Sequence, residues 1–150
     1  MTAQRRVHDK PIVYRRALAR GTLTLRPATL RVLRAGRLDK GDARKTAEIA
    51  GMVAMKRTPE LIPHCHIVPL TGSRVEVTLG RRGVTVEAEA EATHRTGVEM
   101  EALVGATVAL LTVWDMVKYL EKDAHGGYPV TRLGPVRVVR KEKRPLARPA

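Results

Sequence analysis

The sequence predicts an α+β fold in which an antiparallel sheet packs against helices within a single domain. Residues 74–79 and 84–91 alternate strictly between apolar and polar side chains around a GRRG turn, which is typical of a β-hairpin with one buried face. Residues 98–122 are apolar around most of a helical circumference and too long for a buried strand, which predicts a central helix. At 150 residues the chain is expected to form one domain spanning 1–150.

The N-terminal part predicts a strand followed by a short helix. Residues 12–24 alternate in part, so Val13 and Ala17 would share one face of a strand. Residues 27–34 follow with a proline in the first helical turn, where its missing N–H costs nothing. Gly36 then predicts the end of this helix.

A second helix is predicted over residues 43–57. Asp42 precedes it and is a plausible N-cap, because an aspartate side chain can accept hydrogen bonds from the first free backbone N–H groups. Ile49, Met52 and Val53 recur at helical spacing within it. Two prolines shortly after it predict a break in regular structure before the hairpin.

The C-terminal part completes an arrangement similar to the ferredoxin-like plan. The long apolar helix is expected to end at Gly126-Gly127 and to be buried by the sheet and by a second subunit. Residues 134–141 predict a last strand, and residues 1–9 and 142–150 are expected to be flexible basic tails. The predicted order is therefore strand, helix, hairpin, helix, strand.

The charge of the chain predicts an anionic partner. The formal net charge is +13, and residues 1–57 alone carry +11, with 15 Lys/Arg against 4 Asp/Glu. A nucleic acid, a phosphorylated small molecule or simply a solvated basic surface would each fit this charge. The chain has no Phe, one Trp and three Tyr, so it offers few aromatic platforms for stacking single-stranded bases. Charge alone leaves the three readings open.

Composition also sets expectations about the compartment. A single cysteine excludes an internal disulfide and suggests a reducing environment. No apolar run is expected to reach the ~20 residues of a membrane span, and the first residues lack the apolar core of a secretion signal. We therefore expect a cytoplasmic protein without a membrane partner.

His64, Cys65 and His66 superficially resemble a metal site. In an extended segment the two histidines would face one way and the cysteine the other, so the three could not bind one tetrahedral metal. The same divergence argues against a Cys/His nucleophilic pair. We expect no metal; Cys65 would act as a small buried hydrophobe, and His66 could face a substrate. A two-histidine metalloprotein stays a minor alternative.

Three further groups could carry chemistry. Asp115 and Lys118 lie at i, i+3 on the long helix and so share a face, either as an ordinary surface ion pair or as a proton-transfer pair in a cleft that tunes their proton affinities. Glu99 and Glu101 would diverge on a helix or share a face in a strand. Lys40 precedes a glycine and a helix start, where an ammonium and backbone N–H groups could meet phosphate.

Four strings in this order resemble the MoaC family of molybdenum cofactor biosynthesis, the cyclic pyranopterin monophosphate synthases. They are KGDARKTAEIAG (40–51), KRTPELIPHCH (56–66), GVEMEAL (97–103) and ALLTVWDMVK (109–118). The resemblance implies a lyase that converts 3′,8-cyclo-7,8-dihydro-GTP into cyclic pyranopterin monophosphate and releases pyrophosphate. It also implies a ferredoxin-like fold, a homohexamer built as a trimer of dimers with sites at the dimer interface, and no cofactor. A non-enzymatic, basic nucleic-acid-binding domain is the rival reading.

The resemblance also assigns roles to individual residues. The family's leucine before the Cys-His pair is His64 in this chain. By resemblance, the general acid/base residues are Asp115, Lys118 and Lys40. The substrate-binding residues implied in the same way are His64, Cys65, His66, Glu99, Met100, Glu101, Arg15 and Lys141.

Overall fold

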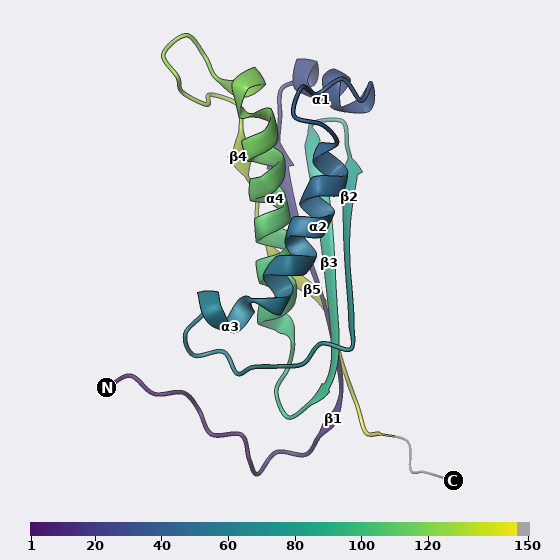
Figure 1. Ribbon diagram of the computed structural model, residues 1–150, viewed down its shortest axis with the longest axis vertical. Helices are drawn as coiled ribbons and strands as arrows, with labels where there is room; N and C mark the ends of the chain where they lie inside the picture. Colours follow the sequence, from purple (N-terminus) through teal and green to yellow (C-terminus); the bar gives the residue numbers. More distant parts are fainter. Residues whose placement is uncertain (147–150) are drawn as a thin grey trace.

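One antiparallel sheet, covered on one face by helices, forms the domain in the computed structural model (Figure 1), which describes residues 1–146. The predicted α+β arrangement of ferredoxin-like type is confirmed. In chain order the elements are β1 (Val13–Thr24), α1 (Pro27–Arg34), α2 (Ala43–Lys56), α3 (Thr58–Leu61), β2 (Gly72–Leu79), β3 (Gly83–His94), α4 (Glu99–Glu121), β4 (Arg132–Leu133) and β5 (Arg137–Arg144).

The sheet is built around β1. Strand β3 pairs with one edge of β1 along its whole length, from Val13 opposite His94 to Thr24 opposite Gly83. Strands β4 and β5 both pair with the other edge of β1, and β2 lies outside β3. A register shift in the β1–β5 ladder bends the pairing near the middle of β1. The order β2-β3-β1 thus continues into two C-terminal strands that share one edge.

Small side chains on the covered face let the helices lie close to the sheet. Ala17 and Ala19 of β1 face Ala88 and Ala90 of β3 in the ladder, and all four are buried. Helices α2 and α4 lie side by side on this face (Figure 1). At their closest approach a Cβ added to Gly51 would lie 2.9 Å from the backbone oxygen of Gly105, so only glycine fits there.

Helix α4 is the central element of the core. Its 23 residues are long and apolar enough to cross a membrane by length and composition, so the sequence-based statement that no run approaches a membrane span is wrong. Half of its most apolar window is buried inside the domain, where α4 packs against α2, β1 and β3. We therefore assign α4 as the core helix of this domain.

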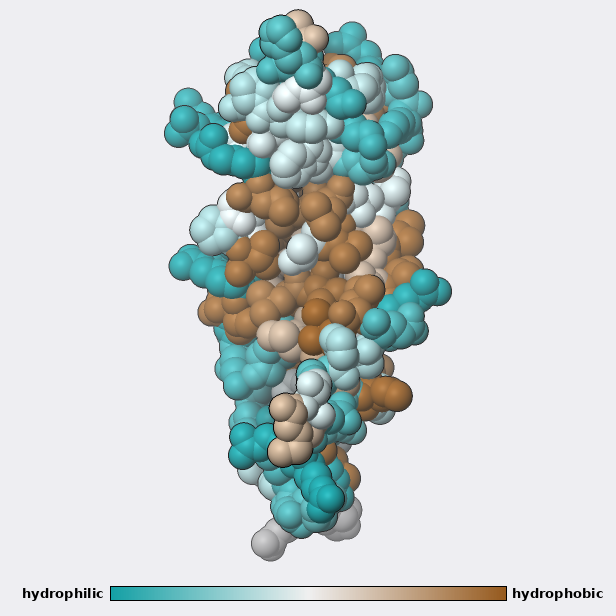
Figure 2. Space-filling model, turned by 90° about the vertical axis from the view of Figure 1, so that its left-hand side faces the viewer, coloured by the Kyte–Doolittle hydropathy of each residue, from teal (hydrophilic) through white to brown (hydrophobic). Residues whose placement is uncertain are grey.

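The other side of α4 is apolar but uncovered. Four apolar residues recur along it at i, i+4, i+8 and i+11, namely Met100, Val104, Val108 and Leu111. They are half-buried or exposed, and Leu111 is 47 % exposed. The α4 side of the domain carries a broad apolar area across its middle, with hydrophilic residues above and below it (Figure 2). We call these four residues the α4 stripe.

Helix α2 buries a different face from the one its apolar spacing suggests. Ile49 and Val53, which predicted the helix, are 50 % and 46 % exposed. Its buried residues are small or unbranched, because α4 approaches too closely for larger ones. They are Ala43, Ala47, Gly51, Ala54 and Met55.

The ends of the chain differ in part from the prediction. The single-turn helix α3 and the two-residue strand β4 were not predicted. Strand β5 runs over Arg137–Arg144 in place of the expected 134–141, so it includes residues 142–144 of the expected C-terminal tail. Residues 147–150 of that tail lie outside the described residues. The first nine residues form no helix or strand.

Candidate functional site

The first group of predicted residues meets near the C-terminal end of α4. Lys118 Nζ lies 2.7 Å from Asp115 Oδ1, one helical turn away on the same face. Lys40 Nζ donates to the backbone oxygen of Asp115 at 3.0 Å and lies 3.6 Å from Asp115 Oδ2. The structure therefore brings the three predicted catalytic side chains together around one carboxylate, and we call this group the Asp115 cluster.

The loop before α2 positions Lys40 beside Asp115. Gly41 has φ +91°, a left-handed conformation that a side chain would strain. Asp42 then caps α2, as predicted, with its carboxylate accepting from the backbone N–H groups of Arg44 and Lys45. The tight turn and the cap fix the position from which Lys40 reaches across to α4.

The charges of the Asp115 cluster reinforce one another. The hydrogen bond and charge of Lys118, and then the charge of Lys40, lower the pKa of Asp115. The hydrogen bond and charge of Asp115 raise the pKa of Lys118. Both pKa shifts therefore run away from neutrality in a single chain, because the Asp115 side chain is 60 % exposed and burial contributes little. In this state Asp115 is a carboxylate and Lys118 an ammonium at neutral pH.

The second group lies at the other end of α4. A cavity of about 190 Å³ is lined by the His64–His66 segment and by residues at the start of α4, including Met100 and Glu101. The backbone turns at the start of the His64–His66 segment, since Cys65 N donates to Ile62 O at 3.0 Å. All three residues of the segment line one cavity, whereas a fully extended segment would direct alternate residues to opposite sides.

Potential metal ligands do not gather at this cavity among the described residues. No three His, Cys, Asp or Glu side chains within residues 1–146 converge as a metal-binding group. Cys65 is half-buried, and burial, followed by the charge of Glu101, raises its thiol pKa. A thiol held protonated in this way suits packing better than attack as a nucleophile.

Glu101 is the most buried acid of this cavity. Only 3 % of it is exposed, and its Oε2 has no hydrogen-bond partner within the described chain. Burial, and then the charge of Glu99, raise the pKa of Glu101. A buried carboxyl oxygen without a partner costs free energy unless something donates to it, so Glu101 suits a ligand that presents N–H groups.

Glu99 points away from Glu101, toward the sheet. It forms an ion pair with Lys141 of β5. Burial acts to raise the pKa of Glu99, but the hydrogen bond from Lys141, a backbone hydrogen bond and the charges of Lys141 and Arg15 together lower it. The two glutamates thus diverge as expected for a helix. Only Glu101 lines the cavity, and Glu99 holds a cation.

Arg15 stands beside this ion pair. Its Nε donates to the backbone oxygen of His94 at 3.1 Å and its Nη2 to that of Arg95 at 3.0 Å. These bonds fix the guanidinium at the end of β3, where the chain turns toward α4. Arg15, Lys141 and Glu99, together with the cavity residues, form what we call the Glu101 cluster.

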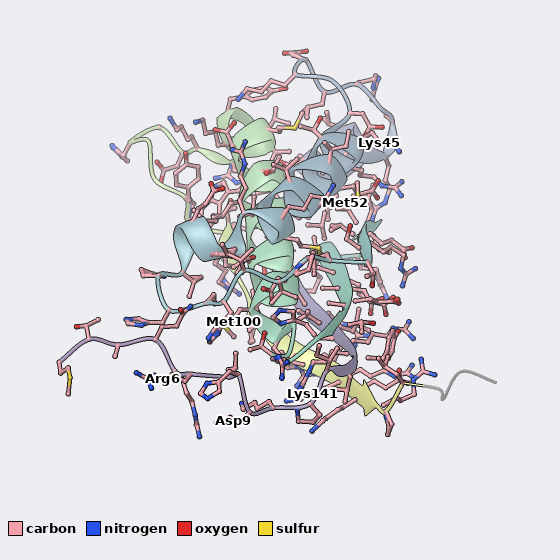
Figure 3. All side chains as sticks on the ribbon, turned by 60° about the horizontal axis from the view of Figure 1, so that its bottom comes forward. Arg6, Asp9, Lys45, Met52, Met100 and Lys141 are labelled. Atoms are coloured by element: carbon pink, nitrogen blue, oxygen red, sulfur yellow. The ribbon has the colours of Figure 1, made fainter. Side chains whose placement is uncertain are left out.

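The two clusters do not meet within one chain. Asp115 follows Glu99 by sixteen positions on one continuous helix, which corresponds to about 24 Å along the axis of α4 at ~1.5 Å per residue. In Figure 3, Met100 and Lys141 lie toward one end of the domain, whereas Lys45, next to the start of α2, lies at the other. The predicted residues therefore form two separate clusters at opposite ends of α4.

The sequence did not reveal two contacts that hold the N-terminal segment against the Glu101 cluster. Gln4 Nε2 donates to the backbone oxygen of Cys65 at 2.9 Å and approaches that of His64 at 3.4 Å. Arg95 Nη1 donates to the backbone oxygens of His8, at 2.7 Å, and Lys10. No local pattern marks either residue, because both act on backbone atoms of distant segments.

Comparisons with known proteins cover nearly the whole chain. The model of the MoaC family matches residues 5–144. A probable cyclic pyranopterin monophosphate synthase of Pyrococcus abyssi is 53 % identical over 137 residues, which cover 91 % of this chain and 86 % of the relative. Proteins with the same description are 49 % identical in Thermococcus kodakarensis, covering 91 % of this chain and 88 % of the relative, and 48 % identical in Methanospirillum hungatei, covering 93 % and 90 %.

Proposed function

We propose, from the premise that this chain belongs to the MoaC family, that it is a lyase of molybdenum cofactor biosynthesis. Its reaction is the conversion of 3′,8-cyclo-7,8-dihydro-GTP into cyclic pyranopterin monophosphate. A ribose hydroxyl oxygen bonds to the α-phosphorus, and the bond from that phosphorus to the β-phosphate oxygen breaks, so pyrophosphate leaves. The same substrate accounts for part of the positive charge, since it carries a triphosphate.

The α4 stripe supports an active site shared between two copies of the chain. Asp115 continues the spacing of the stripe at i+15 from Met100, so the stripe runs from the Glu101 cluster to the Asp115 cluster on one face of α4. An uncovered apolar face between two half-sites suits a second copy of the same chain. An antiparallel α4 pair centred near Val108 would place Asp115 of one copy beside Met100 and Glu101 of the other.

The chemistry divides naturally between the half-sites. In the Glu101 cluster, the carboxyl of Glu101 accepts hydrogen bonds from the donor-rich edge of the guanine-derived ring, with Met100, Cys65 and the two histidines as walls. Arg15 and Lys141 bind the phosphates and stabilise the charge that builds on the leaving pyrophosphate.

The Asp115 cluster supplies the proton transfers. Its carboxylate can accept a proton, and the ammonium groups of Lys118 and Lys40 can donate one. Covering by a second copy would remove water from Asp115 and oppose the low pKa that its two lysines impose. The exposed cluster of the single chain would thereby become a better base in the assembly.

Assembly beyond the dimer follows from the family resemblance. We propose a homohexamer made of three such dimers in the cytoplasm, with its sites at the dimer interface. Light scattering on the purified protein should then give six times the 16.6 kDa subunit mass. A monomer at assay concentration would contradict both the shared site and the hexamer.

The reaction is tested directly with enzymatically prepared cyclo-dihydro-GTP. The expected products are pyrophosphate and a pterin that can be oxidised to a fluorescent form. Absence of both would overturn the proposed function. Binding of nucleic acid in its place, tolerant of sequence and steeply weakened by salt, would favour the rival reading of a basic binding module.

The shared site is tested by mixing two inactive variants. Asp115→Asn and Glu101→Gln homo-oligomers should each lack turnover, because each destroys one half of every site. After dissociation and reassociation of an equal mixture, about a quarter of the sites combine two intact halves, and activity should return. No recovery despite proven subunit exchange would show that both halves come from one chain.

A further inference from the structure

The basic side chains on the two faces of the sheet differ in how many of them form ion pairs. On the uncovered face, Arg16 lies 2.6 Å from Glu89, and Arg20 lies 2.5 Å from Glu87. Arg144 on the same face pairs with Glu142 at 2.6 Å. These three cations are therefore neutralised by acids of the same strand or of a neighbouring strand.

The covered face shows the opposite pattern at the Glu101 cluster. Lys143 lies directly opposite Arg15 in the β1–β5 ladder, and two residues from Lys141 on the same strand. Because side chains alternate along a strand, Lys143 shares the face of Arg15 and Lys141. Glu99 is the one acid that pairs with any of the three; in residues 1–146 neither Arg15 nor Lys143 forms an ion pair.

We propose that Lys143 is a third cation, beside Arg15 and Lys141, that binds the polyphosphate of the substrate and the pyrophosphate that leaves. This inference rests on the proposed function and adds a residue to its substrate-binding set. Three cations next to one acid repel each other in the free protein, and an anion placed between them relieves that repulsion.

The geometry of the strand suits a chain of phosphates. Residues two apart on one strand face are about 6.5 Å apart, and lysine ammonium groups move on flexible four-carbon stems. Lys141 and Lys143 can therefore contact successive phosphates, while Arg15 is fixed between the strands by its bonds to the backbone of β3 and the following residue. Lys143 is exposed, so its ammonium is free to move toward a ligand.

The test is a calorimetric titration of the assembled protein with inorganic pyrophosphate. Lys143→Ala should weaken pyrophosphate binding roughly tenfold, because one charge-assisted contact is lost. Lys143→Arg should keep most of the original affinity. Arg140→Ala is the matched control, because Arg140 lies on the same strand with the same charge but opposite Leu18 on the uncovered face. Its affinity should stay within about twofold of the unmodified protein.

Turnover provides an independent readout. With the cyclised nucleotide, Lys143→Ala should raise KM and leave kcat little changed, since the residue binds phosphate remote from the proton transfers. Equal affinity of Lys143→Ala and the unmodified protein for pyrophosphate would overturn the inference. Equal weakening of pyrophosphate binding by Lys143→Ala and Arg140→Ala would also overturn the inference, because the loss would then depend on net charge alone. Lysine-dependent pyrophosphate binding without turnover would contradict the proposed reaction and leave the role of Lys143 standing.

Discussion

At the scale of single residues, Asp115 is distinguished by its partners and not by burial. Two lysines from different parts of the chain converge on a carboxylate that is largely open to solvent in one subunit. An isolated surface ion pair contributes little to stability, so such a cluster has no structural need for a second lysine. The arrangement therefore supports the proposed proton-transfer centre, which a second copy of the chain would complete.

Replacing Asp115 by Asn should abolish turnover and leave the fold intact. The change removes the acceptor of the cluster, and the exposed position tolerates an amide. Steady-state assays and a thermal melt check both parts. Asp39→Asn is the matched control, since it removes an exposed carboxylate next to Lys40 and should retain activity. An active Asp115→Asn variant would remove Asp115 from the catalytic residues.

Glu101 predicts a dependence of stability on pH. Its pKa is raised in the folded state, chiefly by burial, so ionisation costs stability as pH rises above the usual glutamate value. Glu101→Gln should therefore melt at a higher temperature than the unmodified protein at pH 7–8. The difference should vanish below pH 4, where both side chains are neutral. A constant difference across this range would assign the effect to packing.

At the scale of elements, local patterns predicted most of the fold. The proline at the start of α1, the cap Asp42 and the alternation in β2 and β3 act on near neighbours, so the sequence displays them directly. Helix α3 and strand β4 are too short to leave a periodic pattern, and their existence depends on where the rest of the chain holds them. The shift of β5 has the same cause, because pairing with β1 sets its register.

The candidate site could be predicted only as residues and not as a place. The motifs identified Asp115, Lys118 and Lys40 as one group, and the structure confirms that they meet. The separation of Glu99 and Glu101 from Asp115 follows from the unbroken helix, which the apolar pattern did predict. The positions of residues 64–66, Arg15 and Lys141 near the start of this helix depend on the tertiary fold, which the motifs do not encode. Bonds to backbone atoms, such as those of Gln4, depend on the tertiary fold alone.

The contact between α2 and α4 predicts unequal effects of two glycine substitutions. Gly51→Ala places a methyl group against the rigid backbone oxygen of Gly105 and against Val75, so we expect a loss of roughly 1–3 kcal/mol in the free energy of unfolding. Gly105→Ala meets the flexible side chain of Met55 and should cost less, because Met55 can move and alanine favours the helix. Urea unfolding at equilibrium measures both; equal losses would contradict this account.

At the scale of the whole molecule, the α4 stripe is expected to join two subunits. Leu111→Glu should leave the subunit folded, because the side chain is half exposed, but should release monomers without turnover. Size-exclusion chromatography with light scattering and an activity assay test this together. Thr78→Glu adds the same charge to the uncovered face of β2 and should change neither. An assembled and active Leu111→Glu protein would place the interface elsewhere.

The unbroken length of α4 limits which insertions and substitutions the chain can accept. If both half-sites lie on one rigid helix, the length of that helix fixes the distance between them in every pair of subunits. Substitutions along its outer face alter only the fit between copies. Inserting a single residue between Glu101 and Asp115 would turn the far half-site by about 100° and shift it by ~1.5 Å. Such an insertion would misalign both active sites at once, so the spacing is constrained more strongly than the side chains that fill it.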